Sequence, residues 1–178
     1  TESQVAKRLT FHSANETPCT FTPDGKFIVF TAHYQDPASS ALFPTSRLSE
    51  VYKVPVAGGR AEQLLAFPAD KINFAKSGSK FLYQDIKGFE NNWRKHHTSS
   101  VTRDILEYDL KTNSIKKLID RPGEDTDPFY APDEKTFYFL SEKSGSYNVF
   151  SASLSNPSEM KQITNFIHTC HQWPLDYL

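Results

Sequence analysis

The stretch TFTPDGKFIVF, Thr20 to Phe30, predicts the local architecture from which the rest of the chain can be interpreted. A short apolar run meets a Pro-Asp-Gly turn and then continues into a mainly apolar run, a pattern typical of two antiparallel strands joined by a tight hairpin turn. The pattern recurs as FAKSGSKFLY at Phe74 to Tyr83 and as YAPDEKTFYF at Tyr130 to Phe139. Three copies indicate a repeat protein.

A second segment repeats downstream of each hairpin. VYKVPVAGGRAEQLL, Val51 to Leu65, aligns without a gap with ILEYDLKTNSIKKLI, Ile105 to Ile119, and with one extra residue with VFSASLSNPSEMKQIT, Val149 to Thr164. Each copy is an alternating strand, a turn rich in Gly, Asn, Ser or Pro, and a short strand. Every unit therefore contains four expected strands, a to d, which in the first unit cover residues 18–22, 26–32, 51–56 and 61–65.

Repeated four-stranded units of this length favour an all-β fold, a partial β-propeller of about three four-stranded antiparallel blades, ahead of a closed barrel or a sandwich. Closed propellers typically have four to eight blades, so we expect a fragment, or half of a ring that a second copy would complete. Exposed blade faces also predict a homo-oligomer. Within one propeller domain, the expected parts are the end of a preceding blade and a connection at 1–17, blade one at 18–70, blade two at 71–125, blade three at 126–166 and an atypical tail at 167–178.

Composition excludes several classes of partner. The 178 residues carry 20 Lys and Arg against 21 Asp and Glu, so no basic excess is available to neutralise nucleic acid or an anionic membrane surface. This chain has no run of eighteen apolar residues and no signal peptide, and we expect no membrane partner. Cys19 and Cys170 could form a disulfide, but two lone cysteines are more typical of small buried hydrophobic residues.

The segments between strands b and c differ in length between units. They are long in units one and two, at residues 31–50 and 84–104, and short in unit three, at 140–148. In an up-and-down blade these loops leave the sheet at the same end as the d-to-a connections, so both insertions should lie on one face, joined by Pro122 to Asp127. We call this end of the sheets the insertion face. Long loops on a rigid scaffold are where function tends to lie.

The candidate interaction residues come from this face. Arg can bind a carboxylate with two hydrogen bonds and His can bind a metal, although Trp93 and Arg94 could instead anchor a loop on the neighbouring blade. Glu124, Asp125 and Asp127 lack the spacing of a calcium loop and are expected to form a solvated connection. The candidate face consists of Trp93, Arg94, Lys95, His96, His97, Arg103, Glu124 and Asp125.

No catalytic residue, cofactor or metal is predicted. A Gly-x-Ser-x-Gly elbow is absent from the sequence, and Ser99 and Ser100 are near His97 in sequence only. His168, Cys170 and His171 supply too few ligands for zinc without a second cluster. Packing between sheets, without any ligand, explains the aromatic residues of the expected b strands, Phe27, Phe30, Phe81, Tyr83, Phe137 and Phe139.

Three segments carry a resemblance to a known family: KGFENNWRKHHTSSVTRD (Lys87 to Asp104), GEDTDPFYAPD (Gly123 to Asp133) and YFLSEKSGSYNVF (Tyr138 to Phe150). The units resemble the Pro-Asp-bearing, WD40-like repeats of TolB-type and tricorn-protease-type propellers. More specifically, the chain up to about Ile167 is similar to the amino-terminal propeller of bacterial tricorn-like peptidases of family S41.

The resemblance implies a non-catalytic region that filters or channels peptides toward a separate protease domain, in a periplasmic or secreted protein. No part of this sequence matches that protease domain, so no catalytic residue is carried over and a peptide or protein partner is expected. Two alternatives stay open, namely a stand-alone TolB-like interaction module and a propeller enzyme that uses channel carboxylates or a metal.

Overall fold

Three four-stranded antiparallel sheets make up the part of the chain that the computed structural model describes, residues 6–34, 48–88 and 98–167. In each sheet, strands that follow one another in sequence are neighbours. The predicted all-β fold with about three propeller blades is confirmed. Blade one contains β1 (Glu16–Phe21), β2 (Phe27–Ala32), β3 (Glu50–Pro55) and β4 (Glu62–Leu65), blade two contains β5 (Ala69–Phe74), β6 (Lys80–Asp85), β7 (Ile105–Asp109) and β8 (Ser114–Ile119), and blade three contains β9 (Asp125–Tyr130), β10 (Thr136–Ser141), β11 (Asn148–Ser153) and β12 (Lys161–Gln162).

Turn chemistry explains the hairpin that begins each blade. In blade one, Gly25 has a φ of 68°, a left-handed conformation that glycine adopts without steric cost. The carboxylate of Asp24 accepts a hydrogen bond from the amide of Lys26 at 3.1 Å. Asp133 does the same for Lys135 at 3.0 Å in blade three. The Pro-Asp-Gly stretch is therefore a structural turn, located at the end of the sheet opposite the insertion face.

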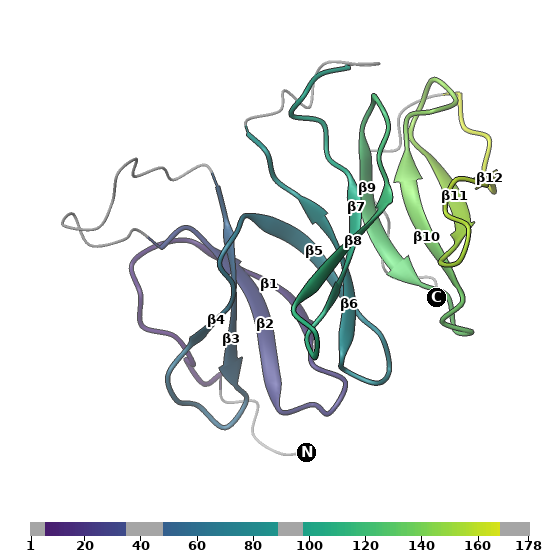
Figure 1. Cartoon of the computed structure of the whole chain (residues 1–178). Coiled ribbons are helices and arrows are strands. Elements are labelled where there is room, and N and C mark those ends of the chain that lie inside the picture. The colour runs from purple at the N-terminus through teal and green to yellow at the C-terminus, as the bar shows by residue number, and fades with distance from the viewer. Residues whose placement is uncertain (1–5, 35–47, 89–97, 168–178) are drawn as a thin grey trace.

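The first strand of each blade lies on the inside of the arc. The three sheets are arranged side by side in chain order, from β1–β4 to β9–β12 (Figure 1). Strand β1 contacts β5, and β5 contacts β9, although these three strands belong to different sheets and do not pair with one another. This is the arrangement of neighbouring propeller blades, whose innermost strands line a common axis.

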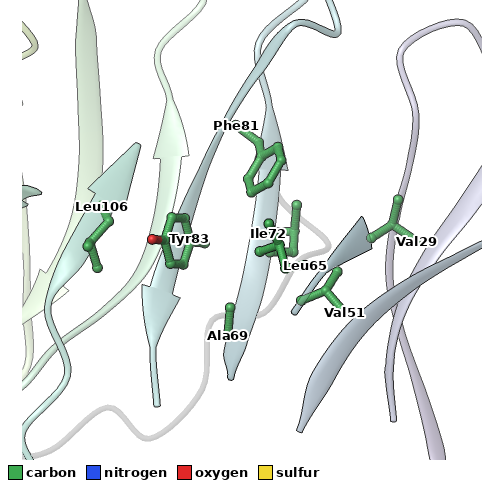
Figure 2. Close-up of a cluster of buried hydrophobic side chains, with 8 residues drawn as sticks. All are labelled: Val29, Val51, Leu65, Ala69, Ile72, Phe81, Tyr83 and Leu106. Carbon is green, nitrogen blue, oxygen red and sulfur yellow. The ribbon is translucent and has the colours of Figure 1, made fainter. Parts of the chain in front are cut away.

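Apolar side chains fill both spaces between blades. The first cluster combines residues of blades one and two, and Figure 2 shows how the side chains from the two sheets face one another: Val29, Val51, Leu65, Ala69, Ile72, Phe81, Tyr83 and Leu106. The second cluster joins blades two and three through Leu82, Ile105, Leu118, Ile119, Phe137, Phe139, Phe150 and Ala152. Packing between sheets thus accounts for the aromatic residues of β6 and β10, as expected from the sequence. In blade one, Phe30 is buried and Phe27 is only half-buried.

Burial along the second strand of each blade shows which faces are covered. In β6 the four residues from Phe81 to Gln84 are all buried, because blade two has a neighbour on each side. In β10 burial alternates strictly, since only the face toward blade two is covered by another blade. The other face carries Tyr138 and Leu140, which are half-buried. The predicted homo-oligomer would cover this face, and it stays a prediction.

Residues 6–15 differ from the expected last strand of a preceding blade. They form no strand, because no partner strand is present beside them among the described residues. Instead they pass over blade one: Lys7 Nζ donates to the carbonyl of Ala57, Leu9 packs against the cluster of Phe30, Ala32, Tyr52 and Val54, and the His12 ring lies 4.0 Å from that of Tyr34. This segment therefore covers the face of blade one that points away from blade two.

The innermost strands have bulges at equivalent positions. Lys71 in β5 and Asp127 in β9 both have left-handed backbones, with φ values of 53° and 51°, and Lys71 Nζ lies 3.2 Å from Asp127 Oδ1. A bulge removes backbone groups from the hydrogen-bond ladder of the strand. In blade three, side chains of blade two accept hydrogen bonds from backbone amides of β9. Gln84 Oε1 accepts from the amide of Asp127 at 3.0 Å, and Asn73 Oδ1 accepts from the amide of Tyr130 at 2.9 Å. These hydrogen bonds fix the register of blade three on blade two.

Candidate functional site on the insertion face

The structure describes the base of the insertion face, while residues 35–47 and 89–97 of the two insertions lie outside the described residues. Of the candidate residues, Trp93, Arg94, Lys95, His96 and His97 lie outside the described residues, as do His168, Cys170 and His171 of the tail. Cys170, the second cysteine of the considered disulfide, is also among them. The structure does place Arg103, Glu124 and Asp125, and it brings them together where the second insertion meets the connection from blade two to blade three.

Ion pairs hold the two ends of the second insertion together. Lys87, just after β6, donates through Nζ to the carbonyl of Thr102 at 2.8 Å and also to the carboxylate of Asp104. The same carboxylate lies 2.8 Å from Lys117 Nζ, and the amide of Asp104 donates to Asp85 Oδ1 at 2.8 Å. Asp104 is only 2% exposed, so the two ammonium groups offset the cost of burying its carboxylate.

Replacing Lys87 should therefore destabilise the folded chain. We expect Lys87→Met to lower the free energy of unfolding by about 2 kcal/mol, because the buried carboxylate of Asp104 loses one of two counter-charges while the half-exposed lysine keeps the effect below that of a fully buried pair. Chemical unfolding measures the difference. Lys111→Met, which changes an exposed lysine at the opposite end of the sheet, should change stability by less than about 0.5 kcal/mol. Equal effects of the two substitutions would contradict the assigned role of Lys87.

Arg103 links the insertion to the connection between blades two and three. Its Nη1 atom donates to Glu124 Oε1, and its backbone carbonyl accepts from the amide of Asp125 at 3.3 Å. Glu124 is 4% exposed and Asp125 is fully buried. The expectation of a solvated acidic connection is therefore wrong for these two residues. Carboxylates that cap strand ends can be buried when cations from the neighbouring loops balance their charge.

Asp125 has a partner that the sequence analysis missed. Arg121, four residues earlier, donates from Nε and Nη2 to Asp125 Oδ1 at 3.2 and 3.0 Å, and its Nη2 also donates to Ser141 Oγ at 2.7 Å. Arg121 Nε lies 3.0 Å from Asp125 Oδ2 as well, but no described residue donates a hydrogen bond to that oxygen. Burial raises the pKa of Asp125 to about 6, although Arg121 opposes the shift. An arginine four residues before an acidic residue in a loop is too common a pattern to have revealed this contact.

Asn148 organises the same end of blade three. Its Oδ1 atom accepts from Thr164 Oγ1 at 3.0 Å and from the amide of Phe166 at 2.6 Å, while Nδ2 donates to Ser144 Oγ at 3.1 Å and to the carbonyls of Ser146 and Phe166 at 3.2 Å. The repeat alignment contains a signal for this residue, because Asn148 occupies the position of Glu50 and Asp104. All three are polar: Glu50 and Asn148 begin the third strand of their blades, and Asp104 directly precedes it.

Described groups on this face make the contacts of turns and loop ends. Ser99 Oγ accepts from the amide of Val101 at 3.2 Å, as in a turn. Within residues 6–34, 48–88 and 98–167, no group of three or more His, Cys, Asp or Glu residues is placed to hold a metal ion. No helix in these ranges is long and apolar enough to cross a membrane. What the face offers chemically is a set of loop ends fixed by charge pairs.

The family assignment follows from comparison of the whole sequence. Residues 1–174 match the model of the tricorn protease N-terminal β-propeller domain. The chain belongs to this family. The match extends past Ile167, where the resemblance was expected to end, and it agrees with the three blades and the position of the repeated turns. A search of curated proteins finds no significant match.

Solved structures with the same fold are larger than this tricorn-family propeller. TolB from Acinetobacter baumannii superposes with a TM-score of 0.61 at 22% identity, over 85% of this chain and 33% of its own. The tricorn protease gives 0.59 at 15% identity, over 88% of this chain and 18% of its own. The β-propeller domain of the Trilobed protease from Pyrococcus furiosus gives 0.56 at 14% identity, over 86% and 44%. The chain thus spans about a third of the TolB structure.

Proposed function

We propose that this chain is a non-catalytic propeller region of a tricorn-like peptidase and that its insertion face receives peptide or protein segments. The observation that carries the proposal is the clamped base of the second insertion, where Lys87, Asp104 and Lys117 fix both ends of a long loop. The family match supports the association with a peptidase, and the absence of a recognisable nucleophile motif supports a role in access or scaffolding rather than hydrolysis.

Loop geometry and conformational entropy support binding on this face. A loop whose ends are already fixed loses less conformational entropy when it binds a ligand than a loop with free ends. The ends of the second insertion are hydrogen-bonded to each other, since the amide of Asp85 donates to the carbonyl of Asp104 at 3.3 Å. The turns at the opposite end, such as that of Asp24 and Gly25, are short and carry no insertion. The insertion face is therefore the favourable end for a partner.

The proposal can be tested with a fluorescein-labelled random decapeptide library and fluorescence anisotropy. We expect saturable binding to the wild-type chain and a weakening of about fivefold or more in Trp93→Ala, because a large aromatic side chain is a common energetic centre of an interface. Phe21→Ala is the matched control: Phe21 is 59% exposed at the opposite end of blade one, and its loss should leave binding unchanged. No saturable binding, or equal weakening by both substitutions, would contradict the proposal.

A further inference from the structure

Both joints between neighbouring blades are built from the same positions of the repeat. The earlier blade contributes one apolar residue from each of its second, third and fourth strands, and we call this side its forward face. The later blade contributes aromatic residues of its second strand, and we call that side its rearward face. The forward residues are Val29, Val51 and Leu65 in the first joint and Leu82, Ile105 and Ile119 in the second, and the rearward aromatic residues are Phe81 and Tyr83, then Phe137 and Phe139.

Blade three has the forward face of a further joint. Its three positions are Tyr138, Val149 and Ile163, and the amide of Ile163 donates to the carbonyl of Val149 at 2.8 Å. Tyr138 and Val149 are half-buried, and Ile163 is 50% exposed. Blades one and three lie at the two ends of the described arc (Figure 1), so no described blade packs on this forward face.

Blade one has the matching rearward face, and residues 6–15, which we call the strap, cover it. Phe30 occupies the position of the rearward aromatic residues in its cluster, and the residue that the described strap adds to this cluster is Leu9. Side chains attach the strap, as when Lys7 donates to the carbonyl of Ala57. Within the described chain, no backbone-to-backbone hydrogen bond joins residues 6–15 to a blade. Such a segment opens at low cost in free energy.

We propose that the rearward face of blade one docks the forward face of blade three from a second copy of this chain, and that the strap competes with this docking. The two joints within the chain identify the occupant, because a second copy presents apolar residues at the three positions that cover a rearward face in both of them. A forward face removes more apolar surface from water than Leu9 alone. The strap has the advantage of belonging to the same chain, so docking depends on protein concentration.

Two copies make two identical joints, in which blade three of each copy meets blade one of the other. A two-fold axis produces this reciprocal pattern, and the assembly closes without exposing a further blade face. Three blades from each copy give a number within the range of closed propellers. The docking does not rest on the proposed peptide binding, because it uses the faces of the end blades and not the insertion face.

Sedimentation velocity of the full chain over a range of protein concentrations tests the competition. Leu9→Asp removes the apolar residue of the strap, so it should lower the dissociation constant of the dimer about tenfold or more. Ile163→Asp places a charge in both joints and should raise that constant about a hundredfold or more. Ile115→Asp is the matched control: Ile115 is 51% exposed on β8 of the middle blade, and its replacement should leave the constant unchanged.

The double variant Leu9→Asp/Ile163→Asp separates specific docking from general stickiness. It should be monomeric, and a double variant that still associates overturns the proposal. A dimer that Ile163→Asp removes but Leu9→Asp leaves unchanged also overturns it, because blade three would then meet a surface other than blade one. If circular dichroism shows that Leu9→Asp does not fold, the wild-type chain decides. A dimer that Ile163→Asp removes and Ile115→Asp retains supports the docking, whereas a monomer at every concentration, or a dimer that Ile163→Asp retains or Ile115→Asp also removes, overturns it.

Discussion

Phe81→Ala should lower the free energy of unfolding by about 3–5 kcal/mol, the largest effect that we expect from a single substitution in this chain. Phe81 is fully buried in the cluster between blades one and two. Its ring stacks on Tyr108 with centroids 5.3 Å apart and meets Phe74 edge-on at 5.2 Å. Removing the ring leaves a cavity that two rigid sheets cannot close. Urea unfolding followed by tryptophan fluorescence and circular dichroism measures the change.

A control separates loss of inter-blade packing from a general intolerance of aromatic deletion. Phe21→Ala removes an aromatic side chain that is 59% exposed, and it should cost less than about 1 kcal/mol. If Phe81→Ala cost no more than Phe21→Ala, the two sheets would not share the apolar core that Figure 2 shows.

Asn148→Ala should destabilise the chain by about 3 kcal/mol, a large effect for a polar residue. The side chain is 1% exposed and makes five hydrogen bonds. The alanine variant leaves Thr164 Oγ1 and the amide of Phe166 without this acceptor, and unsatisfied buried groups cost more than the net value of the bonds themselves. Differential scanning calorimetry should show a lower midpoint temperature.

The matched control for Asn148 is Asn165→Ala, since Asn165 is exposed on the adjacent segment. This change should alter stability by less than about 0.5 kcal/mol. If the Asn148→Ala variant were as stable as Asn165→Ala, the carboxamide of Asn148 would not hold residues 164–167 against blade three.

The strands were predictable because each blade repeats the same local chemistry. Asp24 and Gly25 form a turn that depends on backbone angles and a nearby carboxylate, and such preferences are visible in sequence. The b strands were found for the same reason, since they follow the turn directly. Expected strand 26–32 and observed strand β2 (Phe27–Ala32) differ by one residue.

Residues 6–15 show where the repeat pattern fails to predict the structure. Arg8, Leu9 and Thr10 resemble the end of a fourth strand, but a strand is a property of a pair and not of one segment. With no neighbour to supply hydrogen bonds among the described residues, these residues cover the apolar face of blade one through Leu9 instead. Local pattern predicts propensity, and the available partner decides the structure.

The base of the insertion face was predictable in location but not in detail. Strand order places the ends of the second insertion and the connection of residues 120–124 on one face, and Arg103, Glu124 and Asp125 do meet there. The burial of Asp125 could not be inferred, because its charge is balanced by Arg121. The same holds for Asp104, whose cations Lys87 and Lys117 come from other segments. Charge pairs across loops have no fixed spacing in sequence, unlike turns and strands.

Photo-cross-linking tests the central claim, a binding surface on the insertion face, most directly. The wild-type chain would be incubated with a random decapeptide library that carries a photoreactive phenylalanine analogue, and the cross-linked residues would be identified by mass spectrometry. We predict that cross-links concentrate in residues 31–50 and 84–104 and in the connection at 120–124. Cross-links concentrated in the turns at 22–27, 75–80 and 131–136, at the opposite end of the sheets, would contradict the account.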